Sequence, residues 1–368
     1  MSVIRGARAL TPDGWTGPIE IAVEDGRIAA LRSTDAAVPD CALVPGFVDL
    51  QVNGHDDIDV ATAAGADWDR LDDLLAAQGV TTWCPTLVTA PLEAYATPLD
   101  RIAEAATRRG VRPAIAGAHL EGPFLGGRPG AHPVDLVRPI DLDWLADLPE
   151  VVRMVTLAPE GDLALEAVEA LSARGVLVSL GHSSATYERA TAAVDAGARL
   201  ATHCFNAMAG LHHRTPGLAG AALTDDRMAV SLIADLAHVH PAMLRLAFRA
   251  KGADGVVLVT DAVAWRSGRI GEIAIHADDR ASGGDGVPRL ADGTIAGSAL
   301  RMDAAVRNVV QSAGVALADA ALAASTTPAR LLGLDDRGRL EVGARADVVA
   351  LSAELALAGT WITGQRVA

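Results

Sequence analysis

Hydrophobic positions along this chain group into eight strand-like runs, most of them separated by Ala-, Leu- and Glu-rich stretches with helical spacing, such as 68–77, 163–173 and 185–196. Each run leads within three residues to a polar or ionisable residue. The runs are 43–49, 80–87, 114–119, 151–157, 176–180, 199–203, 230–235 and 255–261. This alternation of strand and helix predicts an α/β fold, a (β/α)8 or TIM-type barrel, in which chemistry lies at the carboxyl ends of the strands.

The two ends of the chain have a different pattern. Short β-type segments with turn residues and no intervening helix fill residues 1–44, and the same style returns at 346–368. Because chain termini commonly lie close together, these segments are expected to pair into a small β-sandwich beside a barrel formed by residues 45–345. Residues 270–294 are expected to form a hairpin inserted after the eighth strand.

Composition limits the partners and the compartment. The formal net charge is −15 and no cluster of Lys or Arg offsets it, so the chain is not expected to bind nucleic acid. Three cysteines without C-x-x-C spacing indicate neither a disulfide framework nor a Cys-type zinc site. The first residues lack a signal-peptide core, and no apolar run approaches the ~18–20 residues of a membrane span. A cytoplasmic protein without membrane partners is therefore expected.

Three of the polar residues at strand ends have the chemistry of a metal site. Glu121, His182 and His203 would supply one carboxylate and two imidazoles, which many hydrolytic zinc sites use while leaving a fourth position open. Asp261 ends another strand and could serve as a general base. A lone histidine at a strand end is more often structural, and a lone carboxylate is often a helix cap. Four such residues at four strand ends favour a catalytic site.

The chain resembles the N-acetylglucosamine-6-phosphate deacetylases of the amidohydrolase superfamily from about residue 45 to residue 350. The resemblance implies a barrel with a flanking β-sandwich, usually a homodimer, that hydrolyses N-acetylglucosamine 6-phosphate to glucosamine 6-phosphate and acetate. The matching segments are Pro45-Gly46-Phe47-Val48-Asp49-Leu50-Gln51-Val52-Asn53-Gly54, His119-Leu120-Glu121-Gly122-Pro123-Phe124, Gly181-His182-Ser183-Ser184-Ala185-Thr186, Ala201-Thr202-His203-Cys204-Phe205-Asn206-Ala207-Met208, His213-Arg214-Thr215-Pro216-Gly217 and Val259-Thr260-Asp261-Ala262.

The resemblance also implies a role for each site residue. Glu121, His182 and His203 match the family's metal ligands, and Asp261 matches its catalytic carboxylate. Asp261 would take a proton from water and return it to the leaving amine, while His238 stabilises the oxyanion together with the metal. The expected substrate contacts are His132 and His238, which match histidines that touch the sugar or polarise the acetyl carbonyl, Asn206 and Ala207 near the phosphate, and His213-Arg214, with Arg214 supplied by the neighbouring subunit. Without that context Arg214 would be taken for a solvated surface residue.

The first strand carries Gln51 and Asn53 where many amidohydrolases have His-x-His. Residues two apart on a strand point the same way, so both amides can face the barrel mouth and the substrate. A neutral amide is a poor zinc ligand, and one divalent ion per subunit is therefore expected: zinc first, with Fe, Mn or Co as alternatives. Cys204 follows His203 directly, points to the opposite side of the strand and is expected in the core.

Three departures from the family leave the substrate's details open. Leu236 stands where the family usually has Gly, 263–266 replaces a Pro/Ala/Gly-rich stretch, and 55–57 replaces a glycine-rich turn. The sugar epimer or the acyl group could therefore differ. The alternatives are a hydrolase for an epimeric or unphosphorylated amino sugar, an N-acyl amino acid or a cyclic amide, and a non-catalytic barrel that serves as a scaffold.

Overall fold

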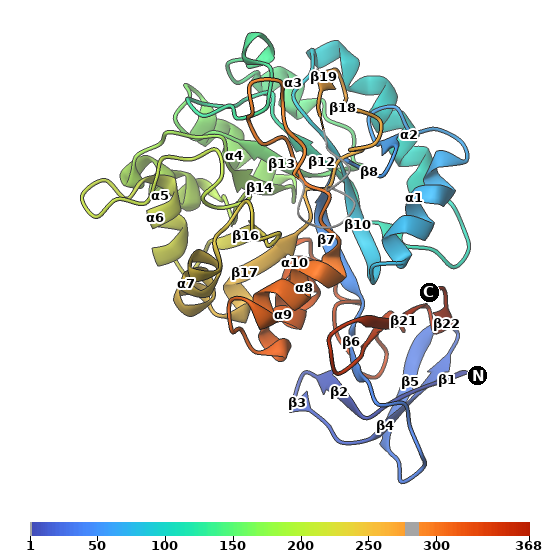
Figure 1. The fold of residues 1–368 in the computed structure, drawn as a ribbon. Coiled ribbons are helices and arrows are strands. Elements are labelled where there is room, and N and C mark those ends of the chain that lie inside the picture. The colour runs from blue at the N-terminus through green and yellow to red at the C-terminus, as the bar shows by residue number, and fades with distance from the viewer. Residues whose placement is uncertain (1, 277–286) are drawn as a thin grey trace.

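A closed parallel barrel forms the centre of the molecule (Figure 1). The computed structural model describes residues 2–276 and 287–368. Neighbouring barrel strands pair in parallel in chain order, and β11 (Ala114–Ile115) lies beside β10. The barrel strands are β7 (Phe47–Val52), β10 (Val80–Leu87), β12 (Ala118–Glu121), β13 (Val152–Leu157), β14 (Leu177–Leu180), β15 (Leu200–Ala201), β16 (Ala229–Ile233) and β17 (Val256–Val259). Beyond the end of β17, Asp261 N donates to Gln51 O at 2.9 Å and Asn53 N donates to Ala262 O at 2.8 Å, which closes the ring.

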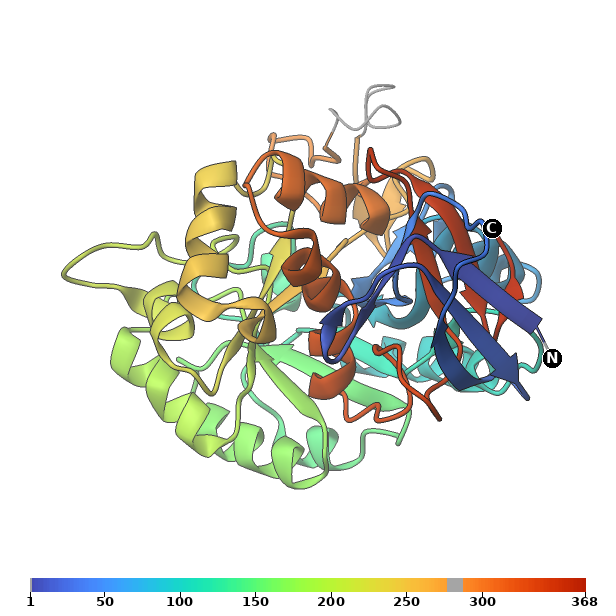
Figure 2. The same cartoon turned by 90° about the horizontal axis from the view of Figure 1, so that it is seen from below.

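Helices surround this barrel, as Figure 2 shows from below. Every residue of β10 is buried, because parallel strands in such a fold are covered on both faces. The helices are α1 (Asp67–Ala76), α2 (Ala96–Ala106), α3 (Leu142–Ala146), α4 (Ala164–Ala173), α5 (Tyr187–Ala196), α6 (Gly217–Thr224), α7 (Pro241–Lys251), α8 (Met302–Gln311), α9 (Leu317–Ala324) and α10 (Thr326–Leu331), with short 3-10 turns at Leu92–Ala94, Val134–Leu136 and Ala253–Gly255. The predicted (β/α)8 barrel is confirmed. None of the helices in the described residues is long and apolar enough to cross a membrane.

The first predicted run, 43–49, divides between two sheets. Its beginning is β6 (Ala42–Pro45), which belongs to the flanking domain, and its end is in β7 of the barrel. Gly46 separates the two strands, and a Cβ atom there would collide with the side chain of Thr81. The chain can therefore pass this close to the start of β10 only at a glycine.

Both chain ends build the flanking β domain, as predicted. One sheet has the order β1–β4–β5 and the other β22–β21–β20–β6–β2–β3. Residues of both sheets, including Ile21, Ile28, Leu43 and Val348, share a separate hydrophobic core. The strands are β1 (Ser2–Gly6), β2 (Arg8–Thr11), β3 (Gly14–Trp15), β4 (Ile19–Glu24), β5 (Arg27–Ser33), β20 (Val348–Leu351), β21 (Leu357–Ile362) and β22 (Gln365–Arg366). The domain boundaries near 45 and 345 remain predictions.

The segment after β17 contains a short hairpin at the start of the expected insertion. β18 (Arg269–Ile270) pairs antiparallel with β19 (Ile273–Ala274), and β8 (Gly54–His55) pairs with β9 (Ile58–Asp59) nearby in the barrel mouth. Asp59 Oδ2 accepts a hydrogen bond from Gly271 N, which joins the two hairpins. The glycine-rich part of the predicted insertion, within 277–286, lies outside the described residues.

Candidate active site

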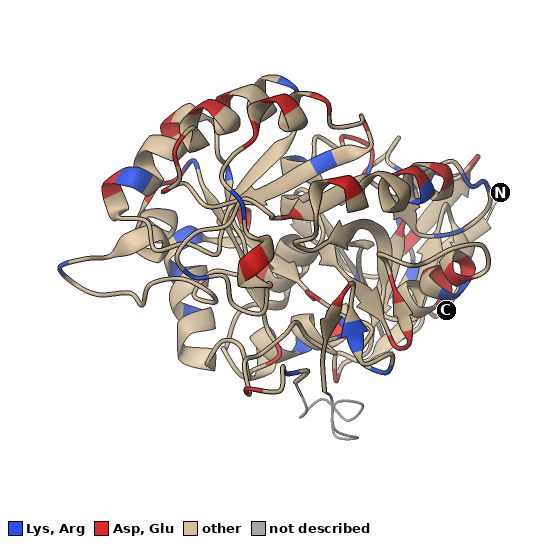
Figure 3. Cartoon of the chain, turned by 90° about the horizontal axis from the view of Figure 1, so that it is seen from above, with Lys and Arg blue, Asp and Glu red and all other residues tan. Residues whose placement is uncertain are grey.

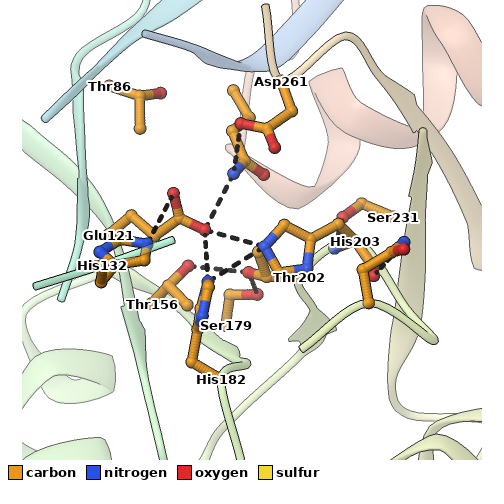
Figure 4. A network of polar contacts seen from close by, with 12 residues as sticks. Thr86, Glu121, His132, Thr156, Ser179, His182, Thr202, His203, Ser231 and Asp261 are labelled. Atoms are coloured by element: carbon orange, nitrogen blue, oxygen red, sulfur yellow. Dashed lines mark hydrogen bonds and ion pairs between the residues drawn. The ribbon is translucent and has the colours of Figure 1, made fainter. Parts of the chain in front are cut away.

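Glu121, His182 and His203 converge at the carboxyl end of the barrel (Figure 4). Glu121 Oε1 lies 3.0 Å from Nε2 of each histidine, and the two Nε2 atoms are 3.1 Å apart. Each of the three residues is at most 4% exposed. Ligand atoms around a tetrahedral ion with bonds of about 2.0–2.1 Å lie about 3.4 Å apart, so this spacing fits a small divalent ion.

The tautomer of His182 supports a cation between these groups. The carbonyl oxygen of Pro129 can only accept, so its 3.0 Å contact places the proton of His182 on Nδ1. A neutral His182 then presents the Nε2 lone pair to the carboxylate oxygen of Glu121. Two acceptors that face each other at this distance repel unless a cation lies between them, and a carbonyl partner on the far nitrogen is typical of metal-binding histidines.

His132 also lies beside Glu121. Within the described chain, ligand atoms of Glu121, His132 and His182 lie within 4.8 Å of one another, so distance alone would admit His132 as a ligand. However, Thr89 N donates to His132 Nδ1 at 3.3 Å, and Thr89 Oγ1, which can also donate, lies 2.8 Å from the same nitrogen. With Nδ1 as the acceptor, the proton of a neutral ring is on Nε2, 3.8 Å from Glu121 Oε2. Burial and the neighbouring His182 lower the pKa of His132 to about 3, so the ring is neutral. His132 therefore offers a hydrogen-bond donor to the site, and His203 completes the ligand set better.

The backbone turns sharply at three of these positions. His182, His203 and Asp261 each stand two residues beyond the last residue of their strand, with φ of 50°, 32° and 50°. Left-handed backbone is costly for residues other than glycine, and such strain is concentrated at functional sites. The same turn at the ends of β14, β15 and β17 brings the three side chains to one centre.

Asp261 is linked to Glu121 through the side-chain amide of Gln51. Gln51 Nε2 donates to Glu121 Oε1 at 3.0 Å and to Asp261 Oδ1 at 3.1 Å, and Asn53 Nδ2 donates to Asp261 Oδ1 at 2.7 Å. Burial, followed by the charge of Glu121, raises the pKa of Asp261 to about 8. Gln51 is fully buried and lies behind the two carboxylates, while Asn53 borders the cavity. The amides of the first strand thus hold the carboxylates in place.

Comparisons with known proteins show the family of this chain. The family model described as "Amidohydrolase family" matches residues 42–367, and the N-terminal domain of formimidoylglutamate deiminase matches residues 1–41. The N-acetylgalactosamine-6-phosphate deacetylase of Escherichia coli is 42% identical, over 99% of this chain and 98% of its own length. The human N-acetylglucosamine-6-phosphate deacetylase is 38% identical, over 99% and 93%. The crystal structure of a Mycobacterium smegmatis N-acetyl-D-glucosamine-6-phosphate deacetylase variant with N-acetyl-D-glucosamine 6-phosphate has a TM-score of 0.92 at 33% identity, covering 100% of this chain and 99% of that one.

The chain belongs to the N-acetylglucosamine-6-phosphate deacetylase family of the amidohydrolases. In this deacetylase, a cavity of about 290 Å³ opens above the convergent residues. Its polar lining includes Asn53, Asn206 and His238, and its apolar wall includes Ala207, Val263 and the β18–β19 hairpin. The insertion after the eighth strand therefore forms part of the cavity.

Arg214 does not reach the cavity of its own chain. Neither Arg214 nor His213 borders it, and both are exposed on the loop 209–216, which projects from the barrel in Figure 1. Figure 3 shows a basic position at the tip of this loop, where Arg214 is the one Lys or Arg. Of the residues that the structure describes around the cavity, none is Lys or Arg. A phosphate bound here must find its strong cation elsewhere.

The departures from the family pattern have structural explanations. Leu236 has φ of 68°, a left-handed conformation in which glycine carries no penalty, so the usual family glycine fits this backbone. Arg266 pairs with the carboxylate of Asp56 at 2.9 Å and donates its backbone N–H to Asp56 O at 2.8 Å. Two of the unusual segments, 55–57 and 263–266, therefore contact each other at the cavity's edge.

One site residue had no predicted role. Asp235 lies between the end of β16 and His238, and its Oδ2 accepts a hydrogen bond from His238 Nδ1 at 2.6 Å. The sequence signal was the Asp-x-x-His spacing, which is too common by itself to single out such a pair. Asp235 decides which nitrogen of His238 carries the proton.

Proposed function

We propose that this protein hydrolyses the acetamide of N-acetylglucosamine 6-phosphate, giving glucosamine 6-phosphate and acetate. The observation that carries the proposal is the convergence of Glu121, His182 and His203 on one point, with the buried Asp261 linked to Glu121 through Gln51. All four chemical positions of the family are present, which argues against the scaffold alternative. Membership of a family of sugar-phosphate deacetylases supports the substrate class.

The donor set suits one divalent ion. Glu121, His182 and His203 would hold it, and zinc is our first choice because zinc favours nitrogen ligands together with a carboxylate. When bound, the ion would supply Lewis acidity to the amide carbonyl and to water. Gln51 directs N–H groups, which are not ligands, toward Glu121 and Asp261, so the first strand does not anchor a second ion.

The chain's own residues account for the proton transfers. Asp261 takes a proton from the attacking water and delivers it to the leaving nitrogen as the C–N bond breaks. Charge develops on the carbonyl oxygen in the transition state, and His132 Nε2–H is a donor suited to that oxygen. His238 in its neutral form presents a lone pair instead. The geometry therefore favours His132 over His238, which the expected mechanism uses, as the oxyanion donor.

The galactosamine epimer is the second candidate substrate. The E. coli relative that acts on N-acetylgalactosamine 6-phosphate is 42% identical, and Leu236 departs from the usual family residue close to Asp235 and His238. Steady-state kinetics of the metal-loaded protein on both epimers, with unphosphorylated N-acetylglucosamine as a third substrate, test the proposal. We expect the glucosamine derivative to have the highest kcat/KM. Higher efficiency on the galactosamine epimer would select the second candidate, and turnover of neither phosphate would refute both.

Arg214 is proposed to bind the phosphate of the neighbouring subunit in a homodimer. Because hydrogen bonds to charged groups contribute about 1.5–3 kcal/mol, Arg214→Ala should lower kcat/KM on the phosphorylated sugar roughly ten- to hundredfold. Unphosphorylated N-acetylglucosamine should scarcely respond. Arg109→Ala is the matched control, because it removes another exposed arginine that is distant in the sequence. It should leave kcat/KM unchanged on both substrates.

Mixed dimers test whether Arg214 acts across the interface. Co-refolding Asp261→Asn chains with Arg214→Ala chains should give hybrids in which one site carries both defects and the other carries neither. With random pairing of equal amounts, about a quarter of all sites should regain wild-type behaviour. A mixture no more active than its Arg214→Ala component would place Arg214 in its own subunit's site or show that this dimer does not form.

The cytoplasm is the proposed location. Cys41, Cys84 and Cys204 are all free and buried, which suits a reducing compartment.

A further inference from the structure

In the loop after β16, Asp235 and His238 form a buried pair in which both carboxylate oxygens accept hydrogen bonds. The side chains of the two residues are 9% and 5% exposed. Asp235 Oδ2 accepts from His238 Nδ1 at 2.6 Å, while Oδ1 accepts from the backbone N–H groups of Ala237 at 2.9 Å and His238 at 2.8 Å. Both carboxylate oxygens are thus committed, and the ring cannot rotate without breaking a short charge-assisted bond.

This arrangement determines whether His238 offers a hydrogen-bond donor or an acceptor to the cavity. A carboxylate only accepts, so Asp235 holds a proton on Nδ1, and a ring that carries this proton alone has its lone pair on Nε2. His132, which borders the same cavity, has the opposite tautomer because Thr89 N–H occupies its Nδ1. One histidine therefore offers a donor to a bound molecule and the other offers an acceptor. A carbonyl oxygen suits the first, and only a group with a proton to donate suits the second.

We infer that Asp235 is a positioning residue that holds His238 as a hydrogen-bond acceptor, and that His238 Nε2 recognises a hydroxyl of the sugar ring by accepting its proton. The sugar as ligand rests on the proposed function, whereas the tautomer rests on contacts within the chain. Sites that hydrogen-bond a substrate hydroxyl discriminate strongly against analogues that lack it, because the protein group is left unpaired. Asp235 would thereby contribute to the choice among amino sugars without touching them.

Asp235→Asn is a nearly isosteric test of the tautomer. The backbone N–H groups of Ala237 and His238 require an oxygen, so the new amide should keep its oxygen on them and turn its NH2 toward His238 Nδ1. An NH2 group cannot accept, and the ring must then carry its proton on Nε2. The substitution should convert His238 from an acceptor into a donor while the side chains stay in place, as an Asp→Asn change does in a serine-protease triad.

Nuclear magnetic resonance of isotope-labelled histidine reports the tautomer directly. In the zinc-loaded wild-type protein at mildly alkaline pH, His238, assigned by its loss in His238→Gln, should carry its proton on Nδ1, and in Asp235→Asn on Nε2. Asp195→Asn, an exposed carboxylate paired with Arg227, should leave the pattern unchanged. A wild-type ring with a proton on Nε2, neutral or charged, would overturn the inference even if the variant failed to fold.

Kinetics on deoxy sugars test the hydroxyl. On the parent substrate Asp235→Asn should lower kcat/KM by roughly tenfold or more, mainly through KM, with metal content unchanged. Among analogues that lack single ring hydroxyls, one should be hydrolysed equally well by the variant and the wild type. An equal loss on every analogue would mean a merely structural role and would overturn the hydroxyl assignment. If neither protein acts on any of these sugars, the proposed function fails, and the ring tautomer still decides the role of Asp235.

Discussion

Asp261→Asn should reduce turnover by on the order of 10²–10⁴, the usual contribution of a positioned general base. The substitution keeps the shape and one carbonyl oxygen for Gln51 and Asn53, so metal content and substrate affinity should persist. Single-turnover kinetics with elemental analysis of the same sample measure both quantities. Asp135→Asn, an exposed carboxylate in the loop after β12, is the control and should have normal turnover. A near-normal Asp261→Asn enzyme would mean that Asp261 is structural.

His182→Ala and His203→Ala should each release the metal and abolish hydrolysis. Elemental analysis of the wild type should find about one divalent ion per chain, because three ligands converge and the first strand supplies amide protons where other amidohydrolases have imidazoles. The loss should extend to binding of added zinc, measured by calorimetry.

Cys204→Ser is the matched control for the metal ligands, since Cys204 directly follows His203. The side chain is fully buried, and burial raises the pKa of its thiol to about 12, so it is not a ready metal ligand. This variant should retain one ion. Two equivalents of metal in the wild type, both needed for activity, would contradict the single-metal site.

The barrel could be predicted because its signals are local and repeated. A short apolar run predicts a buried strand without any information about distant contacts. Such runs lead to Glu121, His182, His203 and Asp261. The division of the first run at Gly46 could not be predicted, since it depends on the approach of Thr81, which lies on another strand. Local hydrophobicity is the same on both sides of that glycine.

The hydrogen-bond partners of the site residues could not be predicted from the sequence either, because they also come from distant parts of the chain. His132 lies in a long loop without a hydrophobic period, and its tautomer follows from a backbone N–H of Thr89, forty-three positions earlier. The left-handed turns at His182, His203 and Asp261 could not be predicted either: aspartate and histidine adopt such backbone more often than most residues, but still in few of their occurrences, and the surrounding structure decides where. The ligand residues can therefore be identified from the sequence, whereas the orientation of their side chains depends on residues that become neighbours only in the folded protein.

The pairing of β6 with β20 has a consequence for how the chain folds as it is synthesised. Val44 lies opposite Val349, so a strand made early meets its partner only after β20 has been synthesised. All eight barrel strands are complete by Val259, whereas the sheet that contains β6 waits for the carboxyl-terminal residues. Contacts of such long sequence separation form slowly. We expect the amino-terminal strands to remain an open edge on the nascent chain, exposed to chaperones and to aggregation until β20 is available for pairing.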